Sequence, residues 1–124
     1  MKTLLILLFG ILISKNPIEN TTWTCKVAEG CFDTLKFKND NLVNEYSCED
    51  NYTCHSSYSY SKNTITIITK DDSHSEDHGK IDYFKIQYAI RGNYLYPFSR
   101  SELINKKWKK VDLKFDKKYF FKKL

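Results

Sequence analysis

The chain has 124 residues and a formal net charge of +5, a length that is enough for one domain. Its longest apolar run is shorter than the ~20 residues that span a bilayer, so no transmembrane segment is expected. No phosphate-binding loop, G-x-S-x-G motif or nucleophile–base set is present, so we expect neither enzyme activity nor a cofactor.

Residues 1–15 have the pattern of a secretory signal peptide. A basic start at Lys2 precedes an apolar run over residues 3–13, and polar residues follow before Pro17. A buried N-terminal helix is the alternative interpretation. The signal-peptide interpretation predicts a secreted, periplasmic or extracellular protein whose single β-barrel domain covers residues 20–124.

All four cysteines lie in this domain, at Cys25, Cys31, Cys48 and Cys54. An even number in a short exported chain favours two disulfides over a zinc site. The repeated C-x5-C spacing suggests the local pairs Cys25–Cys31 and Cys48–Cys54, although four cysteines allow three connectivities. A turn centred on Asn51 would also set Cys48 opposite Cys54.

Alternation with period two dominates from residue 22 and predicts strands at 22–27, 35–38 and 42–48. A two-residue turn at 40–41 sets Leu35 opposite Tyr46. On this register the third of these strands directs four side chains toward the same side as Leu35: Leu42, Asn44, Tyr46 and Cys48.

The next hairpin turns at residues 62–63 and sets Tyr60 opposite Ile65. Its first strand points Cys54, Tyr58 and Tyr60 inward and Thr53, His55, Ser57 and Ser59 outward. The turns thus give several successive strands one consistent apolar face. A one-residue error in register would turn a whole strand over.

Residues 71–80 read as a polar loop, and residues 81–90 as a long strand. This strand has one apolar face, made of Phe84, Ile86, Tyr88 and Ile90. Residues 92–93 suit a two-residue hairpin turn.

The strand at 94–98 contains Pro97, which indicates a sheet edge or the end of the strand. Ser101 would cap a helical turn over residues 101–105. Residues 111–115 and 119–121 are expected to form a last hairpin.

Eight or nine short strands in strict order predict an all-β fold, an antiparallel up-and-down meander that closes into a small barrel. Trp23 in the first strand, the segment 58–67 and the Tyr94–Tyr96 pair carry a resemblance to a known family. In these residues the chain resembles the small bacterial lipocalin-like proteins of the calycin barrels, and the fold class that this implies is a small lipocalin-like barrel. The resemblance implies an antiparallel barrel with Trp23 at its closed end and an apolar ligand in its open mouth.

The residues expected to line a ligand pocket are aromatic. They are Trp23, Phe37, Tyr46, Tyr58, Tyr60, Phe84 and Tyr88. A small barrel filled by these rings is the alternative. The function expected is non-catalytic binding of a small apolar or amphipathic ligand.

The loop at residues 71–78 holds the densest set of metal-ligand types. His74, His78, Asp72 and Glu76 are the candidate ligands for a transition metal, and a solvated loop is the alternative.

Residues 105–124 carry nine lysines against two aspartates, a net charge of +7. This basic segment gives an alternative function, in which a filled barrel acts as an interaction or inhibitor protein. An anionic surface would contact Lys106, Lys107, Lys109 and Lys110, whereas export makes nucleic acid an unexpected partner. The same lysines also suit a solvated face or the protection of a sheet edge.

Overall fold

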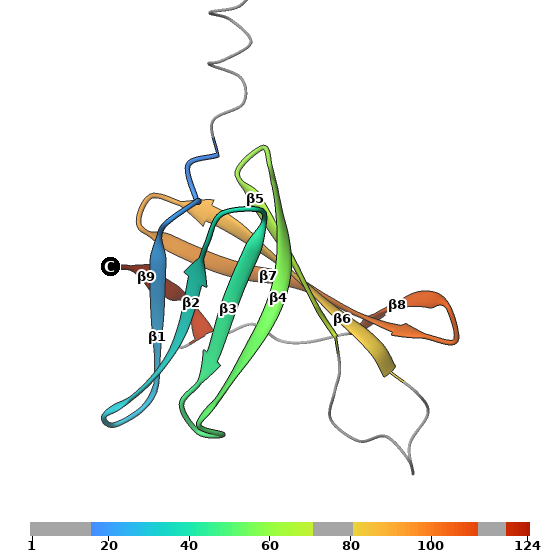
Figure 1. The fold of residues 1–124 in the computed structure, drawn as a ribbon, viewed down its shortest axis with the longest axis horizontal. Coiled ribbons are helices and arrows are strands. Elements are labelled where there is room, and N and C mark those ends of the chain that lie inside the picture. The colour runs from blue at the N-terminus through green and yellow to red at the C-terminus, as the bar shows by residue number, and fades with distance from the viewer. Residues whose placement is uncertain (1–15, 71–80, 112–118) are drawn as a thin grey trace, which may run out of the picture.

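The computed structural model describes residues 16–70, 81–111 and 119–124. Within these ranges nine strands form one antiparallel sheet (Figure 1). They are β1 (Thr22–Ala28), β2 (Cys31–Phe37), β3 (Leu42–Ser47), β4 (Tyr52–Ser61), β5 (Thr64–Lys70), β6 (Ile81–Arg91), β7 (Tyr94–Ile104), β8 (Lys107–Val111) and β9 (Phe121–Lys123). The described residues contain no helix that is long and apolar enough to cross a membrane.

Strands β1 to β7 follow one another as a meander, and each pairs with the next. Strand β9 lies between β1 and β7 and closes a ring of eight strands. Strand β8 pairs with β7 outside this ring, and Figure 1 shows their hairpin projecting away from β1 and β9. The predicted fold class, an all-β antiparallel meander closed into a small barrel, is therefore confirmed.

The hairpins turn where residues adopt the left-handed conformation. Positive φ angles occur at Lys62 and Asn63 between β4 and β5, and at Gly92 between β6 and β7. Asn and Gly tolerate this conformation best. The predicted pairing of Tyr60 with Ile65 and the two-residue turn after β6 are both confirmed.

The predicted register between β2 and β3 is wrong by one residue. Leu35 pairs with Glu45 instead of Tyr46, because the connection has three residues, 39–41, instead of two. Asp40 and Asn41 both have a φ of 59°. Val43 is therefore fully buried, whereas Leu42, expected to point inward, is 50% exposed.

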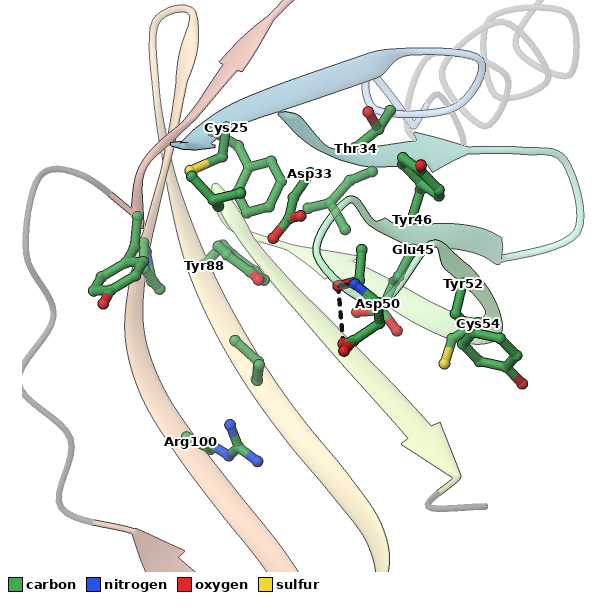
Figure 2. Close-up of a pocket in the computed structure, with 17 residues that line it drawn as sticks. Cys25, Asp33, Thr34, Glu45, Tyr46, Asp50, Tyr52, Cys54, Tyr88 and Arg100 are labelled. Carbon is green, nitrogen blue, oxygen red and sulfur yellow. Dashed lines mark hydrogen bonds between the residues drawn. The ribbon is translucent and has the colours of Figure 1, made fainter. Parts of the chain in front are cut away.

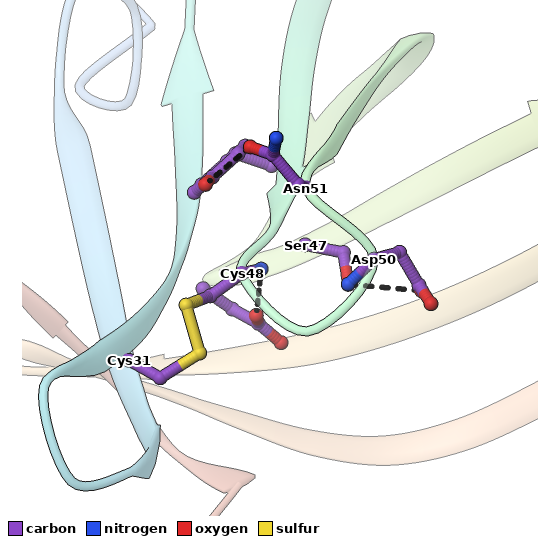
Figure 3. Close-up of a disulfide and its surroundings, with 7 residues drawn as sticks. Cys31, Ser47, Cys48, Asp50 and Asn51 are labelled. Atoms are coloured by element: carbon purple, nitrogen blue, oxygen red, sulfur yellow. Dashed lines mark hydrogen bonds between the residues drawn. A yellow bond between two sulfur atoms is a disulfide. The ribbon is translucent and has the colours of Figure 1, made fainter.

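The β3–β4 register also differs, and with it the disulfide pattern. Four residues, 48–51, join the paired residues Ser47 and Tyr52, so Cys54 faces Glu45 instead of Cys48. Cys48 instead bonds Cys31 at the start of β2, with 5.5 Å between their Cα atoms (Figure 3). The local pairs Cys25–Cys31 and Cys48–Cys54 are therefore wrong, because each would need a sulfur that is already bonded.

Strand β7 continues through Pro97 to Ile104, so the helical turn expected at 101–105 is wrong. A β-bulge accommodates the proline: Tyr88 pairs with Pro97 and Gln87 with Ser99, which leaves Phe98 as the extra residue. In the expected last hairpin, residues 112–118 lie outside the described ranges. Val111 belongs to β8, and β9 pairs with β1 and β7.

The packed core fills the end of the barrel at which β1 begins. It contains Ile18, Trp23, Leu35, Phe37, Val43, Tyr58, Ile65, Ile67, Tyr88 and Leu95. The segment before β1 covers this end, since Ile18 is buried and the Asn16 amide donates a hydrogen bond of 2.9 Å to the Tyr58 hydroxyl. The other end of the barrel interior is built differently and contains the candidate site.

Candidate ligand pocket in the barrel interior

A cavity of about 590 Å³ occupies the interior of the barrel beyond the packed core (Figure 2). Seven of the ring strands contribute side chains to its wall. These include Cys25, Val27, Asp33, Leu35, Glu45, Tyr46, Cys54, Ile86, Tyr88, Pro97, Arg100 and Phe121.

The cavity exists because inward side chains become smaller along the strands. On β1 the inward series runs from Trp23 to Cys25 and Val27. On β4 it runs from Tyr58, in the core, to the buried Ser56. Short side chains cannot fill the interior that the large rings fill at the other end.

One wall of the cavity is acidic, and its carboxylates already have hydrogen-bond donors. The Ser56 and Thr69 hydroxyls each donate to Oε2 of Glu45 at 2.6 Å. The backbone N–H of Cys48 donates to Oδ1 of Asp33 at 2.9 Å, so the disulfide-bonded turn holds this carboxylate in place. Both carboxylates are thus stabilised by the protein itself.

Arg100 enters the cavity from β7 because of the bulge at Phe98. Strict alternation from Pro97 would place Arg100 outward, but the extra residue moves it to the inward position opposite Ile86. Its guanidinium carbon lies 4.6 Å from the centroid of the Phe84 ring. Its Nε is buried and has no hydrogen-bond partner within the described ranges.

Two other groups in the wall are kept in their neutral forms. Burial, followed by the charge of Glu45, raises the pKa of Tyr88, which is 5% exposed. Burial and the nearby Asp33 likewise raise the pKa of the Cys25 thiol. Tyr88 is therefore a hydroxyl donor at neutral pH, and Cys25 has little of the thiolate that nucleophilic chemistry needs.

The structure divides the aromatic residues expected around a ligand. Tyr46 and Tyr88 line the cavity. The rings of Phe37 and Tyr58 pack edge to face in the core with 4.9 Å between their centroids, and Trp23 lies in the same core at 1% exposure. The remaining two have other neighbours: Tyr60 packs against the core, and Phe84 lies under Arg100.

Sequence reasoning missed four charged residues of the cavity, Asp33, Glu45, Asp50 and Arg100. Glu45 follows from the corrected register between β2 and β3. Asp33 lies on the same face of β2 as Leu35, because β2 begins at Cys31 and not at residue 35. A signal for Arg100 was present in Pro97, because a proline within a long strand indicates a bulge as readily as an end.

The metal candidates His74, His78, Asp72 and Glu76 lie outside the described residues. Among residues 16–70, 81–111 and 119–124, no group of three His, Cys, Asp or Glu side chains is close enough to hold a metal ion. His55 is on the outer surface, where its Nδ1 lies 2.7 Å from the Asn44 side-chain oxygen.

The fold and the cavity together define a class: a closed eight-stranded antiparallel β-barrel with an internal pocket of mixed apolar and charged lining. Comparison of the chain with protein-family models, with curated proteins and with solved structures gives no match.

Proposed function

We propose that this protein is a lipocalin-like binding protein that holds a small amphipathic ligand inside its barrel, without catalysis. The observation that carries this proposal is the cavity of about 590 Å³ in the barrel interior. Pockets for small molecules have volumes of about 300–1,000 Å³ and combine apolar walls with a few placed polar groups.

The lining has this mixed character. Val27, Leu35, Ile86 and Phe121 supply apolar surface, while Tyr88 supplies a hydroxyl. A ligand with an apolar body would gain free energy from the area that it removes from water, and a polar group on it would fix its orientation.

We propose that the protein is not catalytic because of the protonation of Cys25, the candidate nucleophile, and the position of His55, the candidate base. The raised pKa of Cys25 keeps its sulfur protonated, and His55 lies on the other side of the barrel wall from the cavity. A general base must come within hydrogen-bond reach of the proton that it removes. In this barrel the one described histidine does not share the cavity with Cys25.

Export is also proposed. The Cys31–Cys48 disulfide supports an oxidising compartment, as does the signal-like pattern of residues 1–15.

The test is binding of N-phenyl-1-naphthylamine, a neutral fluorescent probe, to the purified protein. Val27→Trp fills the cavity and is expected to weaken binding at least tenfold. Lys26→Trp adds the same ring at the exposed neighbouring position and should leave affinity unchanged. The proposal fails if the wild-type protein binds no probe, or if both variants bind as the wild type does.

A second candidate function rests on the projecting β7–β8 hairpin. Trp108 is 42% exposed, and the Lys85 ammonium lies 4.3 Å from the centroid of its ring. Tyr83, 38% exposed, belongs to the same cross-strand row through Leu103. The turn and second strand of this hairpin also carry four exposed lysines: Lys106, Lys107, Lys109 and Lys110.

Exposed aromatic rings among lysines suit the surface of an anionic lipid bilayer. Co-sedimentation with phosphatidylglycerol vesicles, but not with phosphatidylcholine vesicles, is the expected result. The double change of Lys109 and Lys110 to Glu should abolish it, whereas the same change at Lys36 and Lys38, on the barrel, should weaken it less. Binding that is equal for both lipids, or that persists in 1 M salt, would contradict this function.

A further inference from the structure

We propose that the cavity recognises a carboxylate, which Arg100 and Tyr88 bind together from neighbouring strands. The ligand would then be a monocarboxylic acid with a compact aromatic or branched apolar body. This inference rests on the proposed ligand-binding function and specifies the chemistry of the same pocket.

Hydrogen-bond donors and acceptors are unequally matched within the cavity. Glu45 accepts two hydroxyl donors, Asp33 accepts a backbone N–H and Asp50 accepts the Ser47 hydroxyl, so all three carboxylates have donors in the protein itself. Nε of Arg100, in contrast, is buried without an acceptor among the described residues. A buried donor with no acceptor lowers the stability of the protein, and it does so more when the donor belongs to a charged group such as a guanidinium. A ligand that supplies a hydrogen-bond acceptor to Arg100 would therefore complete the hydrogen bonding of this cavity.

The charged side chains enter the cavity from different walls of the barrel. In the ring of eight strands, three strands separate β3 from β7 in either direction, so Glu45 and Arg100 enter from opposite walls. Asp33 enters from β2, next to β3 (Figure 2). An anion held at the β7 wall thus lies nearest the one positive charge that the described residues bring to the cavity, Arg100. The charges of Glu45 and Asp33 also act on the neighbouring Tyr88, and Asp50 lines the cavity from the turn between β3 and β4. The aromatic face of Phe84 covers one side of the Arg100 guanidinium. The N–H donors at the edge of the guanidinium can then bind a ligand.

A second hydrogen-bond donor, Tyr88, lies on the strand next to that of Arg100. Tyr88 and Ile86 are successive inward residues of β6, and Arg100 lies directly opposite Ile86. The Tyr88 hydroxyl remains protonated at neutral pH, because burial raises its pKa. A guanidinium and a phenol on adjacent strands can donate to the two oxygens of one carboxylate.

The apolar part of the ligand has a defined direction. From Arg100 the cavity continues toward Val27, Leu35 and Phe121 on β1, β2 and β9. This surface would cover a ring or a branched chain.

The experiment uses the wild-type protein first. 4-Phenylbutyrate and its neutral analogue 4-phenylbutyramide compete with bound N-phenyl-1-naphthylamine. The carboxylate is expected to displace the probe at a concentration at least tenfold lower than the amide. Equal potency of the two compounds overturns the inference while the probe still reports a functional pocket.

Variants then locate the effect. Arg100→Gln should remove the tenfold preference, measured as the ratio of the concentrations at which the two compounds displace the probe, and Arg100→Lys should retain part of it. Arg91→Gln is the matched control, because it removes the same charge from the exposed end of β6. A preference that survives in Arg100→Gln, or is lost equally in Arg91→Gln, overturns the inference. Failure of the wild-type protein to bind the neutral probe would instead remove the proposed function, and the inference with it.

Discussion

Removing the Cys31–Cys48 disulfide is expected to lower the free energy of unfolding by about 3 kcal/mol. The bond joins residues 17 apart in the sequence, and the chain-entropy relation for a closed loop of that length gives about 3 kcal/mol at 25 °C. For a domain of roughly 100 residues, this loss corresponds to a decrease in Tm of about 10–15 °C.

The assay is thermal and urea unfolding of the double variant Cys31→Ala and Cys48→Ala, followed by tryptophan fluorescence. Wild-type protein treated with dithiothreitol is the control and should unfold at the same temperature as the double variant. Peptide mapping of the unreduced protein should recover one fragment containing both Cys31 and Cys48. A fragment that links Cys25 to Cys31, or a loss of stability below about 1 kcal/mol, would refute this reasoning.

Three further predictions test the register, a turn and the cavity wall. Val43→Ala should lower the free energy of unfolding by about 2 kcal/mol, because Val43 is fully buried, whereas Leu42→Ala, at a 50% exposed residue, should lower it by less than about 0.5 kcal/mol. A larger loss for Leu42→Ala than for Val43→Ala in urea unfolding would contradict the β2–β3 register. Gly92→Ala should lower the free energy of unfolding by about 1–2 kcal/mol in the same assay, because Gly92 has a φ of 58°. No atom lies within 4 Å of an added Cβ, so the backbone conformation alone accounts for this loss, and an unchanged stability would count against this turn. Burial raises the pKa of Tyr88 above its ordinary value of about 10, so the unfolded chain loses this proton first and the free energy of unfolding should fall above pH 10. In urea unfolding at alkaline pH, Tyr88→Phe should show a smaller decrease than the wild type. An equal decrease in both proteins would exclude this cause.

The candidate site was predictable only in part. The inward face of β6 was correct, and it supplies Ile86 and Tyr88 to the cavity. Most of the aromatic rings expected around a ligand pack into the core at the other end, as Trp23 and Phe37 do. Period-two alternation identifies the residues that point inward but does not give their height along the barrel axis. It therefore does not separate a packed end from an open one.

Two charged residues of the cavity, Glu45 and Arg100, were missed because turn length and a bulge decide the direction of their side chains. One additional residue in the connection 39–41 shifts the register of β3, so Glu45 instead of Tyr46 pairs with the inward Leu35. One additional residue at Phe98 turns the second half of β7 and brings Arg100 inward. Single-residue changes of this kind reverse every later side chain of a strand, yet local propensity barely distinguishes them.

The sequence by itself determined the class of fold and the position of most strands. Alternating apolar residues favour half-buried strands, and Asn, Asp and Gly at the turns make short antiparallel connections favourable. Only the tertiary structure decided the closure by β9, the Cys31–Cys48 bond and the charged cavity. Each of these depends on groups that are far apart along the chain, and their approach is fixed by the curvature and registers of the whole barrel rather than by any local pattern.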